Sequence, residues 1–373
     1  MIPRAIHLQD YLEKNKVLVL YGPRQVGKTT LVKEYLHGCK QQYKYYSGDD
    51  ISFSFDFGQC ILQTIRDYVG DCKLFVIDEA QKVPNIGRAL KLLVDNIDGV
   101  SVIVTGSSSF DLANKTGEAL TGRKNIITLF PVAQSELLAI GTPKAVQENL
   151  GDFLIYGTYP DVVTLKGKNK KGERIKEITH AYLLKDILEF DKVKNPRILL
   201  DLLKLLSFQI GSEVSTSELG GSLGIDAKTV SRYLDLLEKS FVLVRFNGYS
   251  RNLRKEVRKM SKYFFYDLGI RNALVSNFNA LNNRDDIGKL WENFLIIERL
   301  KRNAYKHVAV NYYFWRTYEQ KEIDLIEERG GKLYGYECKW DKYRTAKNHE
   351  WLMTYPNSHL EVISRSNYLS FLT

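Results

Sequence analysis

The sequence has few of the features that mark secreted, membrane-spanning or zinc-binding proteins. Its cysteines are scattered without C-x-x-C spacing, so neither a disulfide framework nor a zinc site is indicated; they are Cys39, Cys60, Cys72 and Cys338. No apolar run approaches the roughly 20 residues that a membrane-spanning helix needs. The N-terminus, Met1-Ile2-Pro3-Arg4, has no apolar signal-peptide core. These absences predict a cytoplasmic protein without a membrane partner.

What is present is the composition of a globular protein with more than one core. Hydrophobic residues make up 44% and aromatic residues 12% of the chain, which excludes a disordered protein. The length of 373 residues predicts two or three domains.

The net charge of +10 is unevenly distributed. Seven basic residues lie between Arg245 and Lys262, against the single acidic residue Glu256. A second basic cluster, between Lys166 and Lys176, lies in a segment that contains Gly and Asn, and we interpret it as a solvated loop.

A phosphate-binding loop follows the apolar run Val17-Leu18-Val19-Leu20 and precedes an amphipathic segment. The strand, loop and helix are the context that the pattern G-x-x-x-x-G-K-[ST] requires. Two glycines let successive N–H groups point into one concavity at a helix N-terminus, where phosphate oxygens bind. The nucleotide-binding residues of this loop are Gly22, Pro23, Arg24, Gln25, Val26, Gly27, Lys28, Thr29 and Thr30.

Two side chains of the loop have roles of their own. We expect Lys28 to bridge the β- and γ-phosphates and the Thr29 hydroxyl to bind Mg²⁺. The chain is therefore predicted to bind a nucleoside triphosphate.

Two adjacent carboxylates end the apolar segment Leu74-Phe75-Val76-Ile77. In P-loop enzymes the first, here Asp78, holds Mg²⁺, and the second, here Glu79, polarises the attacking water. A strand-like segment between the phosphate loop and Asp78 suggests the subclass of P-loop fold that has an inserted strand.

Two further candidates lie later in this region. Ser107, or alternatively Thr105, follows a buried strand and could sense the γ-phosphate, but a helix N-cap serine explains the pattern equally well. Arg123 is either an arginine finger that acts on a neighbouring subunit, which requires a homo-oligomer, or one half of a structural ion pair.

These motifs together resemble one family. The phosphate loop, Ile77-Asp78-Glu79-Ala80-Gln81, Thr105-Gly106-Ser107-Ser108, Leu120-Thr121-Gly122-Arg123 and Tyr156-Gly157-Thr158-Tyr159-Pro160-Asp161 look like those of prokaryotic AAA-type ATPases whose C-terminal half carries a domain of unknown function. The resemblance covers nearly the whole chain. It implies an AAA-like fold, ATP as the nucleotide, and a helical lid over that nucleotide at residues 131–195.

A winged helix-turn-helix is predicted from residue 196. Helical patterns at 198–209 and 217–223 precede a third helix opened by Asp226, in which Val230, Tyr233, Leu234 and Leu237 share one face. Two strand-like runs, 241–245 and 263–266, flank the basic stretch as a wing would. Such a third helix can enter a DNA major groove, although winged helices also serve as packing modules.

The C-terminal region carries a second group of acidic residues. The segment 288–300 reads as a helix that is buried on nearly every side, so Glu292 and Glu298 need partners or raised pKa values. If Gly330-Gly331 is a two-residue turn, Asp324 faces Glu337 and Glu322 faces Lys339.

This hairpin suggests a metal site. Asp324 and Glu337, with Glu292, would supply oxygens for Mg²⁺, and Lys339 would orient the attacking water. The segment resembles the D…E-x-K arrangement of restriction-endonuclease-like nucleases, except that Ile323 stands where a proline often precedes the aspartate. The alternative is a set of cross-strand ion pairs without catalysis.

The predicted fold class is α/β with four parts. They are an AAA-like P-loop domain with a parallel sheet at 1–130, a helical lid at 131–195, a winged helix at 196–285, and a restriction-endonuclease-like α/β domain at 286–373. The expected function is ATP hydrolysis with Mg²⁺ and DNA as the partner, together with a metal-dependent nuclease domain. The alternatives are a switch whose C-terminal domain only binds DNA or protein, and a signalling or chaperone-like ATPase with no nucleic-acid partner.

Overall fold

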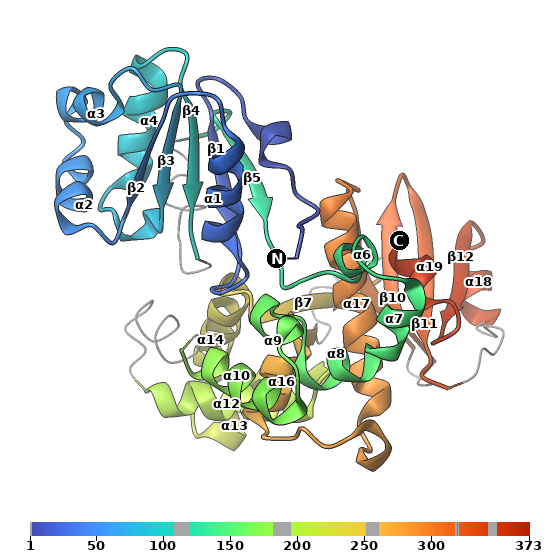
Figure 1. Cartoon of the computed structure of the whole chain (residues 1–373). Helices are drawn as coiled ribbons and strands as arrows, with labels where there is room; N and C mark the ends of the chain where they lie inside the picture. The colour runs from blue at the N-terminus through green and yellow to red at the C-terminus, as the bar shows by residue number, and fades with distance from the viewer. Residues whose placement is uncertain are drawn as a thin grey trace. The chain divides into compact units, whose positions relative to one another are not determined.

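The computed structural model of the chain divides into two compact units. One comprises Arg4–Phe130 (the N-terminal unit), and the other comprises Met1–Pro3 and Pro131–Thr373 (the C-terminal unit). The structure describes residues 2–107, 120–181, 195–250, 261–317, 319, 321–341 and 349–373. Figure 1 gives the element labels used below.

The N-terminal unit alternates strands and helices along the chain. Its elements are β1 (Val17–Tyr21), α1 (Lys28–Gly38), β2 (Tyr43–Ser47), α2 (Ile51–Gly58), α3 (Leu62–Val69), β3 (Leu74–Asp78), α4 (Ile86–Asn96), β4 (Ser101–Thr105) and β5 (Lys124–Thr128).

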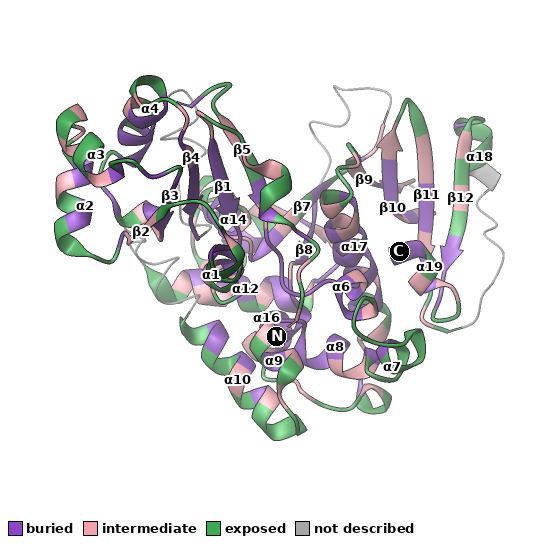
Figure 2. Cartoon of the chain, turned by 45° about the horizontal axis from the view of Figure 1, so that its top comes forward, coloured by how far each residue is buried: buried purple, intermediate pink, exposed green. Residues whose placement is uncertain are grey.

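Its five strands form one parallel sheet in the order β2-β3-β4-β1-β5. Strand β4 thus lies between β1 and β3, and the sheet is the parallel α/β sheet that the sequence predicted. The strands β1 and β3 are buried along their full length because helices cover the sheet, with α1 and α4 on opposite faces (Figures 1 and 2). Parallel strands place all their carboxyl ends at one edge, where the phosphate loop begins.

The C-terminal unit contains more elements. Its helices are α6 (Gln134–Leu138), α7 (Pro143–Glu148), α8 (Leu150–Tyr156), α9 (Pro160–Thr164), α10 (Lys168–His180), α12 (Pro196–Phe208), α13 (Thr216–Leu223), α14 (Ala227–Lys239), α16 (Leu268–Leu274), α17 (Ile287–Tyr305), α18 (His349–Thr354) and α19 (Tyr368–Leu372). Its strands are β6 (Glu213–Val214), β7 (Leu243–Gly248), β8 (Ser261–Phe265), β9 (Asn311–Arg316), β10 (Glu322–Arg329), β11 (Lys332–Cys338) and β12 (Ser358–Ile363).

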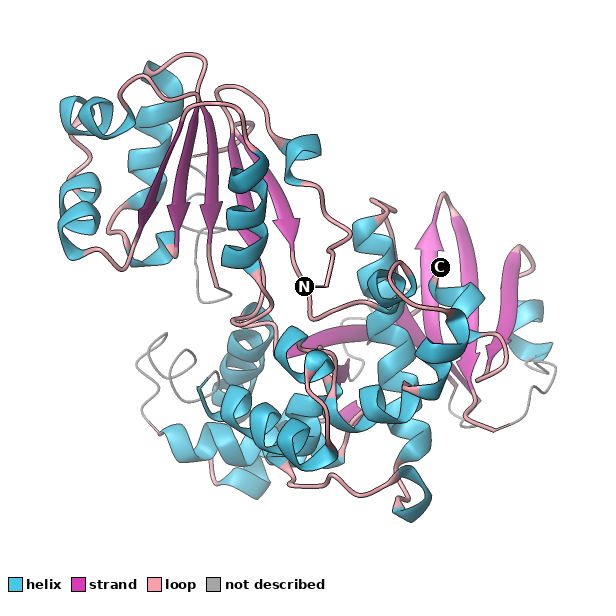
Figure 3. Ribbon diagram, viewed as in Figure 1, coloured by secondary structure: helices cyan, strands magenta, loops and turns pink. Residues whose placement is uncertain are grey.

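A single seven-stranded sheet runs through this unit, in the order β12-β11-β10-β9-β7-β8-β6 (Figure 3). The predicted wing strands β7 and β8 pair antiparallel, and β7 also pairs parallel with β9 through Asn247 and Gly248. The sequence did not predict this junction. It satisfies the backbone groups that β7 would otherwise expose at a sheet edge. The three segments 131–195, 196–285 and 286–373 consequently share one core.

The helices α12, α13 and α14 begin at side-chain caps. Asn195 Oδ1 accepts a hydrogen bond from Ile198 N, Ser215 Oγ from Glu218 N, and Asp226 Oδ1 from Thr229 N at 2.8 Å. In α14 the predicted apolar face is buried, including Val230 and Leu237.

Helix α17 is buried on nearly every side, as its sequence predicted. Its two most buried ion pairs are Glu298 with Lys301, at 2.7 Å, and Arg299 with Glu327, at 2.8 Å. Glu298 Oε2 also accepts a hydrogen bond from Gln134 N at 2.7 Å, which ties α6 to α17. Burial raises the pKa of Glu298, while Lys301 opposes that rise.

One prediction about the basic segments is wrong. The cluster between Lys166 and Lys176 is not a loop, because Lys168–His180 forms α10. Ile175 and Ile178 lie on the buried face of this helix and hold it against the core, while Lys168 and Lys170 are exposed. Among the described helices, none is both long enough and apolar enough to cross a membrane.

Candidate nucleotide site and candidate acidic site

The phosphate loop has the backbone that its glycines predicted. Gly22 has a φ of 145°, and a Cβ there would lie 2.0 Å from the Leu129 carbonyl oxygen, so only glycine fits between β1 and the end of β5. Gly27 has a φ of 95° and stands directly before α1, which begins at Lys28. The loop therefore opens onto a helix N-terminus, where phosphate oxygens bind.

Arg4 braces this loop from the beginning of the unit. Its Nη1 donates to the Val26 carbonyl and its Nη2 donates to the Phe130 carbonyl, both at 2.6 Å. Val26 is buried, while Gln25 and Thr30 are exposed. The guanidinium thus joins the middle of the loop to the chain that leaves β5.

Lys28 is buried and points back into the loop. Its Nζ donates to the carbonyl oxygens of Gly22 and Pro23, both at 2.8 Å. The ammonium therefore lies inside the concavity of the loop, between Gly22 at one end and Gly27 at the other. Phosphate oxygens that enter this concavity would take over the ammonium as a donor.

Asp78, at the end of β3, accepts hydrogen bonds from three hydroxyl groups. Thr29 Oγ1 and Tyr45 OH donate to its Oδ2, each at 2.8 Å, and Thr105 Oγ1 donates to its Oδ1. These donors come from α1, β2 and β4. Burial, together with the bond to Asp78, raises the pKa of Tyr45, so the phenol remains a donor.

Glu79 has a left-handed backbone conformation, with a φ of 51°, which is uncommon outside glycine and typical of functional turns. Its amide donates to Thr105 Oγ1 at 3.0 Å, and its carboxylate accepts from Gln81 Nε2. Gln81 Nε2 also donates to the buried Ser107 Oγ at 3.2 Å. Ser107 and Glu79 are therefore linked through one amide group.

Thr105, the alternative sensor, is already bonded to Asp78. The residues that follow Ser107, including Ser108 of the family motif, lie outside those described, so the N-cap interpretation of Ser107 stays a prediction.

Arg123 lies at the other end of the sheet. It immediately precedes β5, and its carbonyl accepts from Val17 N at the start of β1, whereas the phosphate loop follows the end of β1. Five residues of strand span about 16 Å. Arg123 therefore does not reach the nucleotide of its own chain, and its Nε forms an ion pair with Asp95. The structural ion pair that the sequence allowed is present.

The acidic hairpin of the C-terminal unit has the predicted register. Gly330 and Gly331 form the turn, and Leu325 pairs with Tyr336, which makes Asp324 and Glu337 the next positions along the two strands. Asp324 Oδ2 accepts from Cys338 N at 2.7 Å. Lys339 Nζ lies 4.0 Å from Glu337 Oε2. Burial raises the pKa of Glu337, Lys339 opposes that rise, and the nearby charge of Asp324 adds to it.

Lys262 supplies the cation of this acidic group. Its side chain is 2% exposed, and its Nζ forms ion pairs with Glu292, at 3.3 Å, and with Glu322. Burial alone would lower the pKa of Lys262, but the two carboxylates outweigh it and raise the pKa. Burial and the charge of Asp324 raise the pKa of Glu292 to about 8.

One prediction is corrected by this arrangement. Lys262, which the sequence placed in the basic wing, is a buried partner of carboxylates, because β8 runs beside them and turns its side chain inward. Glu322 forms an ion pair with Lys262 and lies opposite Arg316 of β9, on the side of β10 away from β11. Arg245 of the wing lies in β7 and forms an ion pair with Glu238 at 3.5 Å. The other five wing residues lie outside the described residues: Arg251, Arg254, Lys255, Arg258 and Lys259.

The expected convergence of Glu292, Asp324 and Glu337 on one metal ion is not found in the described part of the chain. There, no group of three or more His, Cys, Asp or Glu residues is arranged to hold a metal. The Lys262 ammonium pairs with Glu292, one of the three expected ligands, and with Glu322, which was not among them.

Several residues of these sites were missed by the sequence analysis. Gln81 belongs to the motif Ile77-Asp78-Glu79-Ala80-Gln81. Tyr45 lies on β2, the strand that pairs with β3 up to Asp78. No local pattern in the sequence pointed to Arg4 or to the inward direction of Lys262.

Profiles of known families match three successive parts of the chain. Residues 14–138 match a family profile described as an AAA domain. Residues 147–282 and 287–362 match two profiles that are each described as a domain of unknown function, DUF8612 and DUF4143.

Related proteins extend over most of the chain. An uncharacterised protein of Mycobacterium tuberculosis is 28% identical over 339 residues, which cover 90% of this chain and 73% of that protein. An uncharacterised protein of Haemophilus influenzae is 24% identical over 356 residues, which cover 89% of this chain and 85% of that protein. A Walker-type ATPase of Pyrococcus abyssi has a TM-score of 0.45 and 13% identity, over 72% of this chain and 92% of that one.

The AAA-domain match and the phosphate-loop geometry lead to the same conclusion. The N-terminal unit is a P-loop ATPase domain of the AAA type.

Proposed function

We propose that the chain is an ATP-hydrolysing switch that associates with DNA. The observation that carries the ATPase part is the 2.8 Å hydrogen bond between the Thr29 hydroxyl and the Asp78 carboxylate, directly beside the buried Lys28. These are the oxygen and ammonium groups that bind Mg²⁺ and the β- and γ-phosphates in P-loop enzymes. The Thr29 hydroxyl would bind the ion, and the Asp78 carboxylate would orient the water molecules that surround it.

Bound Mg²⁺ would supply charge neutralisation on the phosphates. The residues of the chain account for the rest. Glu79, held by Gln81, would accept a proton from the attacking water, and Ser107 would register the γ-phosphate through the same Gln81 amide. Loss of that phosphate would change the contact between β3 and β4, which makes Gln81 a candidate for the switch.

The first prediction separates binding from turnover. Lys28→Ala should weaken ATP binding by about tenfold or more, because the phosphates lose a counter-charge. Glu79→Gln should bind ATP within about twofold of wild type but release phosphate about 100-fold more slowly, because the amide cannot accept the proton. Equilibrium binding of ATP and steady-state phosphate release measure the two effects.

The matched control is Glu34→Gln, on the exposed side of α1. It should behave as wild type. Normal turnover in Glu79→Gln would remove Glu79 from the role of base.

The support for DNA comes from the segment around α14. Helices α12, α13 and α14 are followed by the β7–β8 hairpin, and β6 pairs with β8, which is the element order of a winged helix. The buried face of α14 contains its apolar residues, and the exposed stripe contains Lys228, Arg232 and Lys239 beside one acid, Asp235. A recognition helix needs such a basic outer face to approach phosphates.

The second prediction tests this face. Replacing Lys228, Arg232 and Lys239 by Ser should weaken binding of duplex DNA and lower the slope of log affinity against log salt by about one unit per lost phosphate contact. A fluorescence-anisotropy titration at several salt concentrations measures both quantities.

The control carries the same change of charge around the start of α10, where Lys166, just before the helix, and Lys168 and Lys170 within it are replaced by Ser. It should retain most of the affinity. Equal losses in the two variants would mean that net charge and not the α14 face attracts DNA. If wild type binds no DNA at any salt concentration, the signalling or chaperone-like alternative replaces this proposal.

A second candidate concerns the acidic hairpin. The D…E-x-K resemblance supports a metal-dependent nuclease, in which Asp324 and Glu337 would bind Mg²⁺ and Lys339 would orient water. The buried Lys262 supports the other alternative, a C-terminal domain that binds DNA or protein without cleaving it. We favour the non-catalytic alternative, because Lys262 already neutralises Glu292, the third expected ligand, and because no group of three or more metal-ligating side chains is arranged to hold an ion in the described residues.

The third prediction distinguishes the two. Lys262→Met should lower the free energy of unfolding by about 3–5 kcal/mol in chelated buffer, because buried carboxylates lose their cation. Mn²⁺ should restore part of that stability in the variant, since carboxylate oxygens then bind it. Wild type should gain little from Mn²⁺. Chemical denaturation with and without Mn²⁺ measures the difference.

Lys289→Met, an exposed position on the same helix as Glu292, should be insensitive to Mn²⁺. Strong stabilisation of wild type by Mn²⁺, with DNA cleavage that Asp324→Asn abolishes, would favour the nuclease.

A further inference from the structure

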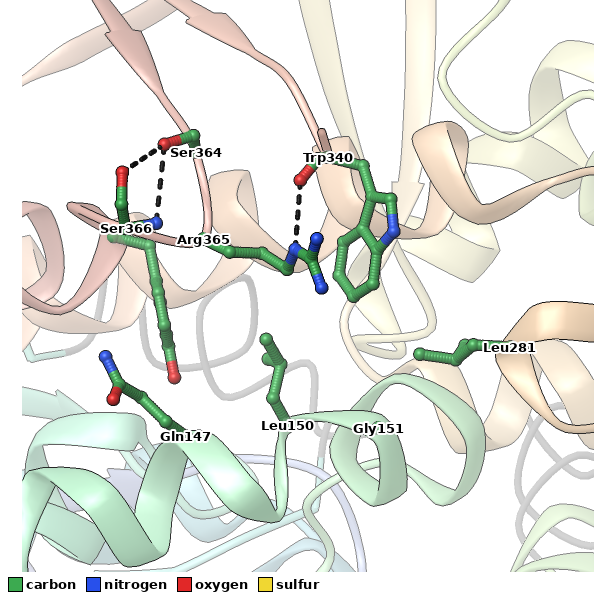
Figure 4. Close-up of a pocket in the computed structure, with 9 residues that line it drawn as sticks. Gln147, Leu150, Gly151, Leu281, Trp340, Ser364, Arg365 and Ser366 are labelled. Atoms are coloured by element: carbon green, nitrogen blue, oxygen red, sulfur yellow. Dashed lines mark hydrogen bonds between the residues drawn. The ribbon is translucent and has the colours of Figure 1, made fainter. Parts of the chain in front are cut away.

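The C-terminal unit contains a cavity of about 620 Å³ that none of the sites above uses. The helical segment α7–α8 forms one side of it, and the chain that follows β11 and β12 forms the other. Figure 4 shows Gln147 and Leu150 on the helical side and Arg365 extended toward Trp340 on the sheet side. A cavity of this volume accepts a ligand of small-molecule size.

Arg365 and Trp340 form a planar, positively charged platform in this cavity. The guanidinium carbon lies 4.6 Å from the centre of the indole ring, and Nε donates to the Trp340 carbonyl at 3.2 Å. A second guanidinium nitrogen pairs with Asp341 at 3.2 Å. Trp291, fully buried in α17, packs edge-on against Trp340 at 5.4 Å. Guanidinium and indole planes both stack with nucleobases.

The other polar groups of the cavity can both donate and accept hydrogen bonds. Ser364 Oγ is 2.8 Å from Ser366 Oγ, and Gln147 supplies an amide from α7. Leu150 provides an apolar wall. Arg365 is the only charged residue among those that line the cavity, within the described part of the chain. Neutral hydrogen-bonding groups around a stacking plane suit the edge of a base. The guanidinium of Arg365 uses Nε for the Trp340 carbonyl and Nη2 for Asp341, which leaves Nη1 as a donor for one phosphate oxygen.

The cavity adjoins the acidic hairpin. Trp340 follows Lys339 directly, and Lys339 N donates to the Ile363 carbonyl at 2.9 Å, so the ends of β11 and β12 meet here. Trp291, which supports the platform, precedes Glu292 in α17. A single strand of nucleic acid that passes the acidic hairpin would therefore have one nucleotide within reach of the cavity.

From these observations we infer that the cavity binds one nucleotide, with its base stacked on the Arg365–Trp340 platform, its edge facing Gln147 and Ser366, and its phosphate on Arg365. The inference rests on the proposed association with nucleic acid and adds to it a single-stranded binding position. A free mononucleotide carries the same chemistry as a nucleotide within a strand, so the experiment includes both.

The test uses the full chain with Lys28→Ala, which suppresses nucleotide binding at the phosphate loop. A labelled deoxyhexanucleotide is titrated by anisotropy, and adenosine monophosphate is titrated by quenching of tryptophan fluorescence. Trp340→Leu and Arg365→Gln should each weaken hexanucleotide binding by about tenfold or more, the usual effect of losing one stacking contact. Gln147→Ala should weaken hexanucleotide binding several-fold. Because Gln147 is exposed on α7, this variant should keep the thermal stability of wild type, so that its loss of affinity cannot come from misfolding.

The control is Arg174→Gln, an arginine of α10 that pairs with Asp161 away from the cavity. It should bind as wild type. Tighter binding of the hexanucleotide than of the monophosphate identifies a strand as the ligand, and equal binding identifies a free nucleotide.

Wild-type affinity in all three cavity variants overturns the inference, as does failure of both probes to bind. If duplex DNA still binds through α14 in either case, the association with DNA stands without the cavity. If duplex DNA also fails to bind, both proposals fail.

Discussion

The nucleotide site depends on how the buried Asp78 carboxylate is satisfied. A buried carboxylate requires partners, and here the partners are the three neutral hydroxyls of Thr29, Tyr45 and Thr105, which come from α1, β2 and β4. Because no lysine or arginine neutralises it in these bonds, the charge remains available to a cation that arrives with a nucleotide. The same bonds fix the phosphate loop, the end of β3 and the end of β4 relative to one another, so that Glu79, Gln81 and Ser107 are placed by one carboxylate.

The acidic hairpin of the C-terminal unit is satisfied in a different way. Glu292 and Glu322 receive a buried ammonium from Lys262, whose strand β8 belongs to the same sheet. Removing one partner from such a buried pair costs more than the pair contributes, so the fold of this unit depends on Lys262. A domain that carries its own cation among these acids does not need a divalent ion for stability. The contrast between the two sites supports our proposal that one unit hydrolyses ATP and the other binds a partner.

Much of this organisation follows from local patterns. The phosphate loop could be predicted because steric contacts require its glycines. At Gly22, for example, a Cβ atom would lie 2.0 Å from the Leu129 carbonyl oxygen. The register of the acidic hairpin is readable because a two-residue turn leaves one pairing, and Leu325 opposite Tyr336 confirms it. The partners of Asp78 and of Glu292 could not be predicted, because Tyr45 reaches Asp78 through the pairing of β2 with β3, and Lys262 reaches Glu292 through the packing of β8 against α17. A run of basic residues gave no sign that its last member, Lys262, turns inward.

The most direct test of the account is the Mg²⁺ dependence of ATP hydrolysis in Thr29→Ala, with the exposed neighbour Thr30→Ala as the control. If Thr29 and Asp78 form the ion site, the Mg²⁺ concentration for half-maximal phosphate release should rise by about tenfold or more in Thr29→Ala. In Thr30→Ala it should equal that of wild type. An unchanged Mg²⁺ dependence in Thr29→Ala would contradict the account, because the hydroxyl that bonds to Asp78 would then have no part in holding the ion.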